Sequence, residues 1–220
     1  MHRLFNYRLS RASVRRFALA EGLASEPPPK IKAPVKRWQR SRIGELWRLD
    51  ATPHAWFPHL SQNFPFLNLL DDCSHLHLNA KIYAVENLLA YLDFLPAAFL
   101  VHGLPLEIYV DYHSIFFSHT NSTQLGEALG FYGVSFRYAP TPQAKGKIER
   151  DHQTWQHRLL ALFASEVIAN FAPANELIVK LLDHRNIHET HRELAMTPQR
   201  AWDKALEEKR SALRRVPTCP

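Results

Sequence analysis

Three acidic residues lie at positions where a charge is costly. Asp50 is in the apolar run 46–51, Asp111 directly follows the apolar run 106–110, and Glu149 is in the first turns of an expected helix. Carboxylates that are partly desolvated and brought together raise one another's pKa unless a cation neutralises them. Such oxygen ligands suit Mg²⁺ or Mn²⁺, and two of these ions can clamp the attacking and leaving oxygens of a displacement at phosphorus.

Each acid also has a purely structural interpretation. Asp50 alone fits a turn at the end of a strand, Asp111 fits a helix or turn cap, and Glu149 fits a solvated helix surface. The metal site is therefore a hypothesis about the three residues together.

Strands and helices alternate in the part of the chain that must position these acids. β-type runs cover residues 46–51, 66–70, 76–85, 106–110 and 134–138. Helical patterns cover residues 86–101, 123–129, 144–164, 175–185 and 197–215. Three strands in an antiparallel meander, followed by alternating helices and strands, predict an α/β fold with a mixed sheet.

Positive charge is concentrated at the N-terminal end. Residues 1–43 hold 11 of the 27 Lys and Arg residues but only 2 of the 21 acids. This pattern fits a polyanion partner such as DNA and fits a solvated leader equally well. Arg11, Arg15 and Arg16 belong to an expected helix over 10–22, either the last helix of a helix-turn-helix unit or a lone amphipathic helix. A Pro-rich basic linker follows.

Composition excludes several classes of protein. Cys73 and Cys219 are too few for a disulfide framework, and no apolar run is long enough to cross a membrane. We therefore expect a soluble cytoplasmic protein. Asp71 and Asp72 are interpreted as turn residues. The group of His184, His188 and His191 is interpreted as exposed helix-end residues rather than a zinc site, and His113 or His54 as an accessory polar group near the acids.

The motifs around the acids resemble a known family. Asp50-Ala-Thr-Pro-His, the tract 111–116 and the Lys-Gly-Lys-Ile-Glu-Arg sequence of residues 145–150 look like the catalytic core of bacterial insertion-sequence transposases and retroviral-type integrases. The resemblance covers about residues 44–164. There are 60 residues between Asp50 and Asp111 and 37 between Asp111 and Glu149, the second gap being close to that family's mid-thirties spacing. Residues 196–202 resemble a tract that these transposases carry after the core.

The resemblance implies a ribonuclease H-like fold, a mixed five-stranded sheet flanked by helices, with an N-terminal basic helix and linker and C-terminal helices. It also implies that Asp50, Asp111 and Glu149 are catalytic and bind two Mg²⁺ or Mn²⁺ ions. The expected activity is metal-dependent cleavage of transposon-end DNA and strand transfer into target DNA. The expected partners are double-stranded DNA and further copies of the chain, in the DNA-associated cytoplasm of a bacterium.

The expected organisation has four parts. Residues 1–24 are interpreted as the remnant of a helix-turn-helix domain, 25–43 as the linker, 44–172 as the catalytic core and 173–220 as a helical extension. Lys145 lies four residues before Glu149 and either meets a phosphate or pairs with that acid in solvent. The residues expected to contact DNA are Lys145, Lys147, Arg150, Gln153, Arg11, Arg15 and Arg16.

Two other functions remain open at this point. Missing flanking domains are consistent with a truncated, non-catalytic DNA-binding remnant of a transposase. A nuclease of the same fold that acts on RNA in hybrids is the other alternative, although the residue 145–150 motif favours a transposase.

Overall fold

The computed structural model describes residues 11–23, 39–57, 59–138 and 146–217, and only the backbone of residues 11 and 146–153. The chain forms two units, Met1–Trp38 and Gln39–Pro220. In the described part of the first unit, helix α2 (Arg11–Ala20) ends before Gly22, whose φ of 66° suits the end of a helix. The expected N-cap at Ser10 lies outside the described residues.

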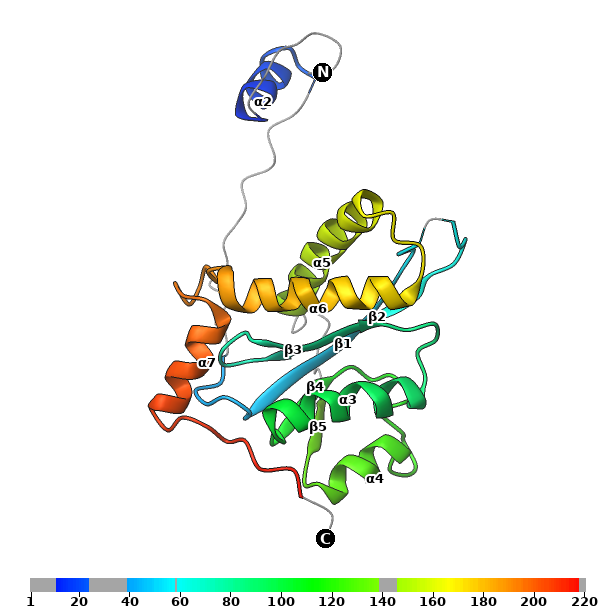
Figure 1. The fold of residues 1–220 in the computed structure, drawn as a ribbon, viewed down its shortest axis with the longest axis vertical. Helices are drawn as coiled ribbons and strands as arrows, with labels where there is room; N and C mark the ends of the chain where they lie inside the picture. Colours follow the sequence, from blue (N-terminus) through cyan, green and yellow to red (C-terminus); the bar gives the residue numbers. More distant parts are fainter. Residues whose placement is uncertain (1–10, 24–38, 58, 139–145, 218–220) are drawn as a thin grey trace. The chain divides into compact units, whose positions relative to one another are not determined.

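The second unit is built on one five-stranded sheet (Figure 1). Its strands are β1 (Leu46–His54), β2 (Phe64–Asp71), β3 (His77–Ile82), β4 (Glu107–Val110) and β5 (Ser135–Tyr138), in the order β3-β2-β1-β4-β5. The first three are antiparallel, whereas β4 runs parallel to both β1 and β5. The predicted mixed sheet with an antiparallel meander is confirmed.

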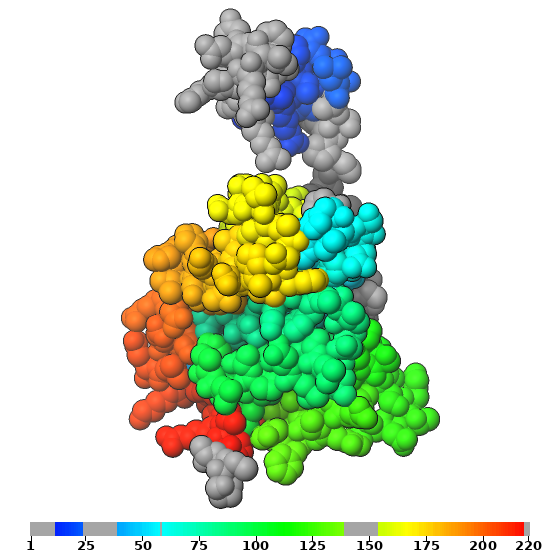
Figure 2. Space-filling model, turned by 45° about the vertical axis from the view of Figure 1, so that its right-hand side comes forward, coloured from blue at the N-terminus to red at the C-terminus, as the bar shows by residue number. Residues whose placement is uncertain are grey.

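Helices cover both faces of this sheet. They are α3 (Leu88–His102), α4 (Gln124–Phe131), α5 (Gly146–Ser165), α6 (Phe171–His188) and α7 (Pro198–Glu207). Figure 1 shows α5 and α6 on one face and α3 and α4 on the other. In Figure 2 the green surface of α3 lies between α6 in yellow and α4 in lighter green. None of the helices in the described part of the chain has the length and apolar character needed to span a bilayer.

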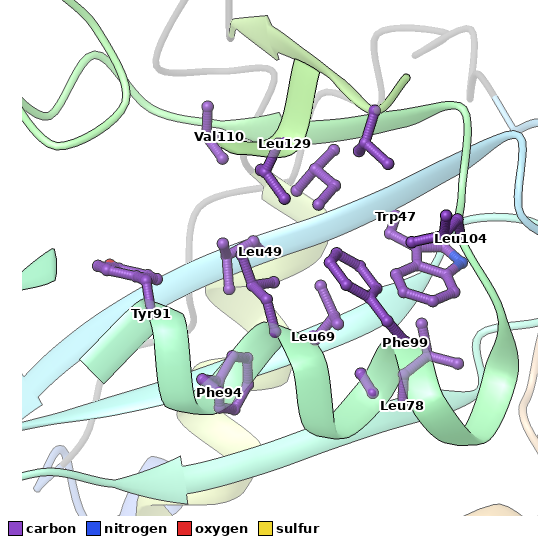
Figure 3. Close-up of a cluster of buried hydrophobic side chains, with 14 of the residues drawn as sticks. Trp47, Leu49, Leu69, Leu78, Tyr91, Phe94, Phe99, Leu104, Val110 and Leu129 are labelled. Atoms are coloured by element: carbon purple, nitrogen blue, oxygen red, sulfur yellow. The ribbon is translucent and has the colours of Figure 1, made fainter. Parts of the chain in front are cut away.

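Side chains alternate between the two faces because successive strand residues point in opposite directions. On one face Trp47 and Leu49 of β1 pack with Tyr91, Phe94 and other residues of α3 (Figure 3). A second buried cluster on the opposite face joins strand residues to α5 and α6 and contains Phe64, Phe66, Ala80, Ile82, Trp155, Leu159, Phe163, Ala174 and Ile178. The even-numbered residues of β1 therefore face α5.

The last predicted helix is shorter than expected. It was expected to continue to residue 215 but ends at Glu207, because Lys209 has a left-handed φ of 55° that a helix cannot continue through. Residues 210–216 instead run as an extended segment, which we call the C-terminal strap. It forms bridges between Ile43 and Ser211 and between Leu104 and Arg214.

The turn after β2 is a buried charged cluster. Asp71 ends β2 and Asp72 lies in the predicted turn, but both are fully buried. Asp71 accepts hydrogen bonds from the backbone N–H groups of Gly44 (2.9 Å) and Ser74 (2.8 Å), and Asp72 forms an ion pair with buried Arg48 (2.6 Å). These two acids therefore hold the start of β1 against the end of β2.

Candidate active site

Adjacent parallel strands bring two of the three predicted acids to one place. Leu46 pairs with Glu107 and Arg48 with Tyr109. The last pair lies two residues before Asp50 in β1 and two residues before Asp111, which directly follows β4. Both acids are half-buried at the carboxyl end of β4.

Asp50 faces the helix that carries the third acid. Trp47 and Leu49 of β1 pack with α3, so the alternation directs Asp50 towards the opposite face. Helix α5 packs on that face and contacts β1. Asp111 directly follows Val110, the last residue of β4. The backbone of Glu149 lies in the first turn of α5, and its side chain is outside the described residues.

A row of buried polar groups continues from Asp50 across the sheet. Asn68 of β2 is the cross-strand partner of Asp50, and its Oδ1 lies 3.1 Å from His77 Nδ1. Asn186 of α6 accepts from the backbone N–H of His77 (3.0 Å) and donates to its carbonyl (2.8 Å). This row fixes α6 to the edge strand β3 on the side of the sheet that Asp50 faces.

Tyr91 of α3 is a titratable group on which both of these acids act. Its hydroxyl donates to Glu86 Oε1 (2.6 Å). Burial raises the pKa of Tyr91, and the hydrogen bond to Glu86 and that residue's charge raise it further. The charges of Asp111 and Asp50 also raise the Tyr91 pKa, so both acids lie within electrostatic reach of this ring.

Sequence patterns did not identify Asn68, His77, Tyr91 or Glu86. Asn68 is recognisable only once β1 and β2 are paired in register, because nothing in its immediate neighbours marks it. Glu86 precedes Asn87, the N-cap of α3, so it lies outside the helix. Its contact with Tyr91 therefore follows no helical spacing that a sequence pattern could reveal.

The loop after β4 is shaped by Asp111 itself. The Asp111 Oδ1 atom accepts from the backbone N–H of His113 (3.1 Å), and His113 Nδ1 accepts from the backbone N–H of Ile115 (3.3 Å). His113 is therefore near Asp111, as expected, and organises the turn. His54 ends β1 and packs its ring against Trp56 at 4.9 Å.

The basic residues expected to contact DNA are only partly described. Arg15 and Arg16 are exposed on α2 in the first unit. The described backbone of α5 includes Lys147, Arg150 and Gln153, which are close to Glu149 in the chain. The side chains of these three residues and of Arg11 lie outside the described residues. Lys145 lies wholly outside the described residues.

The histidine group does not form a metal site in the described structure. His184 and His188 are exposed near the end of α6, as predicted, while half-buried His191 stacks on His75 with ring centroids 4.2 Å apart. Among the described side chains, which exclude that of Glu149, no three His, Cys, Asp or Glu residues form a potential metal site. The donor chemistry at Asp50 and Asp111 nevertheless fits a hard divalent cation, since two carboxylates on adjacent strands repel each other unless a cation lies between them.

Comparison with known proteins identifies relatives in two groups. No family model matches the chain. The transposase for insertion sequence IS1202 of Streptococcus pneumoniae is 32% identical over 170 residues, covering 73% of this chain and 36% of the relative. A Sinorhizobium fredii protein named as a transposase, y4bF, is 27% identical over 202 residues, covering 89% of this chain and 43% of the relative. The chain thus spans less than half the length of these relatives.

Solved structures give the same fold. The HTLV-2 integrase catalytic core domain in complex with magnesium, in its dimeric form, matches with a TM-score of 0.59 and 16% identity, over 74% of this chain and 99% of that one. The BIV integrase catalytic core domain matches with a TM-score of 0.54 and 19% identity, over 76% of this chain and 98% of that one. The chain is therefore related to insertion-sequence transposases and has the ribonuclease H-like fold of the retroviral integrase catalytic core.

Proposed function

We propose that the chain is the catalytic part of a DNA transposase, which cleaves transposon-end DNA and transfers the freed strand into target DNA. The observation that supports this proposal most is the parallel pairing of Leu46–Arg48 of β1 with Glu107–Tyr109 of β4, because Asp50 and Asp111 each lie two residues beyond the last pair. The relatives named as transposases support the reaction class.

In this proposal Asp50, Asp111 and Glu149 hold two Mg²⁺ or Mn²⁺ ions. The magnesium in the HTLV-2 integrase core supports the choice of cation. When bound, such ions activate a nucleophile and stabilise the charge that develops at phosphorus. Glu149 closes the site from α5, while Asp50 and Asp111 are fixed by the sheet. The loop bond from His113 N–H to Asp111 Oδ1 orients one carboxylate oxygen.

The protein's other residues position the DNA. Lys145, Lys147, Arg150 and Gln153 flank Glu149 and are proposed to contact phosphates near the cut, whereas Arg11, Arg15 and Arg16 are proposed to bind the duplex from α2. Phosphate contacts of this kind set register and orientation without reading sequence. No covalent protein intermediate is needed, because water attacks first and the released 3′-hydroxyl attacks the target strand.

A metal titration with a fluorescent hairpin DNA tests the proposal. We expect Mn²⁺-dependent nicking by the wild-type chain and a fall to background in Asp111→Asn, with Asp183→Asn on the exposed surface of α6 as the matched control. Retention of DNA without nicking would contradict the catalytic proposal and favour the non-catalytic remnant. Preferential cutting of an RNA–DNA hybrid would favour the nuclease instead.

We also propose that copies of the chain associate through the outer face of α3. This helix is mostly apolar, with Asp93 as its one acid, and its residues Leu100 and Val101 are each 75% exposed. Helices that are apolar on all sides are normally buried. Dimeric and trimeric forms of the HTLV-2 core support self-association.

The mass in solution tests the interface on α3. The double variant Leu100→Lys, Val101→Lys is expected to shift light-scattering mass towards that of a 25.5 kDa monomer, because buried lysine pairs lose their hydration. Val179→Lys, an exposed apolar residue on α6, should leave the mass unchanged. An unchanged mass in the double variant would contradict this interface.

A further inference from the structure

A cluster of aromatic rings lies beside Asp111, at the carboxyl ends of β4 and β5. Tyr112 stacks on Tyr138 with ring centroids 5.2 Å apart and ring planes 16° from parallel. Phe117 packs edge-on against both, at 5.0 Å from Tyr112 and 5.3 Å from Tyr138. We call Tyr112, Phe117 and Tyr138 the aromatic platform.

The platform is held by the loop that Asp111 organises. The Tyr138 hydroxyl donates to the Phe116 carbonyl (2.7 Å), and the backbone N–H groups of Phe116 and Phe117 both donate to the His113 carbonyl (2.9 Å each). Buried Phe116 packs against Tyr91, with ring centroids 5.0 Å apart. The platform is therefore tied to Asp111 at one end and to the core of α3 at the other.

Tyr112 is the exposed member of the aromatic platform. Its side chain is 57% exposed, while the ring beneath it, Tyr138, is half-buried. Burial and the adjacent Tyr112 raise the pKa of Tyr138. Phe116 belongs to the buried cluster under α3 and Tyr138 packs against that cluster, whereas Tyr112 is not part of it.

A flat exposed ring beside a proposed phosphoryl-transfer site suits one type of ligand. Every nucleobase has a π-face that stacks on aromatic side chains, and this contact tolerates any sequence. A paired base inside a duplex already has both faces covered by its neighbours, so only an unpaired base can use the platform. Asp111 directly precedes Tyr112, so a base stacked on Tyr112 is next to a residue proposed to hold the metal ions.

We propose that the aromatic platform binds an unpaired base of the DNA next to the scissile phosphate. This inference rests on the proposed function, because it takes Asp111 as part of the cleavage site. The platform stacks the base on Tyr112 and so holds the frayed strand end against Asp111. By this role Tyr112 is a substrate-binding residue, and Phe117 and Tyr138 position it.

The test compares two DNA probes in Ca²⁺, which supports binding without turnover. One is a duplex with an unpaired 3′ overhang that carries 2-aminopurine, and the other is the same sequence fully paired. Binding to the overhang probe should quench the fluorescence of 2-aminopurine through stacking. In Tyr112→Ala the affinity for that probe should fall roughly 5- to 150-fold, as expected for the loss of one stacked base. Affinity for the paired probe should not change.

Three further variants separate stacking from folding. Tyr112→Phe and Tyr112→Trp keep an aromatic ring and should retain both affinity and quenching. Phe131→Ala removes an 84% exposed ring at the end of α4, which precedes the start of β5 whereas Tyr138 is at the end of that strand, and should have no effect. Equal thermal unfolding of Tyr112→Ala and wild type would show that the fold is kept.

Two results would overturn the inference, and they differ from each other. If the wild type nicks DNA in Mn²⁺ but Tyr112→Ala binds and quenches the overhang probe like wild type, the platform does not bind a base although the proposed function stands. If the wild type neither nicks DNA nor binds either probe, the proposed function fails and the platform inference fails with it. An equal loss of affinity for both probes in Tyr112→Ala would also contradict base stacking.

Discussion

Asp71, at the end of β2, is a fully buried carboxylate that accepts four hydrogen bonds within its own turn and from Gly44. Burial raises its pKa to about 6, more than the hydrogen bonds from Gly44 and Ser74 lower it, and the charge of Asp72 adds to the increase. The folded chain therefore holds a proton on Asp71 at a pH where the unfolded chain has released it.

This difference predicts a pH dependence of stability. Between about pH 4 and pH 6 the folded state binds more protons at Asp71 than the unfolded state, so the free energy of unfolding falls as the pH rises. The loss is about 3 kcal/mol once the pH exceeds the folded-state pKa. Urea denaturation of wild type and Asp71→Asn across pH 4–7 measures it. The wild type should lose stability relative to the variant as pH rises, and parallel curves would refute the shift.

The candidate site was predictable from the sequence only in part. Asp50 and Asp111 stood out because each interrupts or ends an apolar run, a local signal that needs no knowledge of pairing. Asn68 and Tyr91 had no such signal, because their relation to the acids exists only through strand register and helix packing. The aromatic platform was missed for the same reason, as Tyr138 is distant in sequence from Tyr112.

At the scale of elements, the C-terminal strap ties three loops together. Leu104 and Arg214 exchange backbone hydrogen bonds of 2.8 and 3.0 Å, and the Arg214 guanidinium donates to the carbonyls of Pro105 and Gly133. The strap leaves no room beside Gly44, where an added Cβ would overlap the side chain of Leu213. Gly44 also has a φ of 71°, a conformation that side chains disfavour.

A pair of glycine substitutions tests the strap. Gly44→Ala should destabilise the fold by about 2 kcal/mol or more, because it adds backbone strain and a clash with Leu213. Gly130→Ala, in α4 with no atom within 4 Å of the added Cβ, should stabilise it by about 0.5–1 kcal/mol. Urea denaturation of both variants gives the comparison. Equal stabilities would mean that the strap does not pack on Gly44.

The order of elements was predicted correctly because hydrophobic periodicity and turn residues are local signals. The end of the last helix was not, since Lys209 adopts a left-handed conformation that its residue type does not favour. The strap bonds to segments near Ile43 and Leu104 that are far away in sequence. Such long-range pairing overrides the helical tendency of residues 208–215.

At the scale of the whole molecule, the basic N-terminal segment should supply salt-dependent DNA affinity. The double variant Arg15→Glu, Arg16→Glu should reduce the slope of log affinity against log salt by up to about 2, one for each lost phosphate contact. Arg200→Glu with Arg215→Glu, two exposed residues of the second unit, is the charge-matched control. Fluorescence anisotropy in 50–200 mM salt measures the slope, and equal effects of the two pairs would argue against a dedicated role for α2.

The hydrogen bonds of the C-terminal strap also determine how late in synthesis the second unit can complete its folding. The Arg210 guanidinium donates to the Ser41 carbonyl, 169 positions earlier in the chain, and Ala212 donates to the Ile43 carbonyl. Residues 210–214 therefore have to leave the ribosome before the segment that precedes β1 can form these hydrogen bonds. Until then we expect apolar surface of the sheet and α3 to stay exposed, and exposed apolar surface of this kind favours aggregation during synthesis.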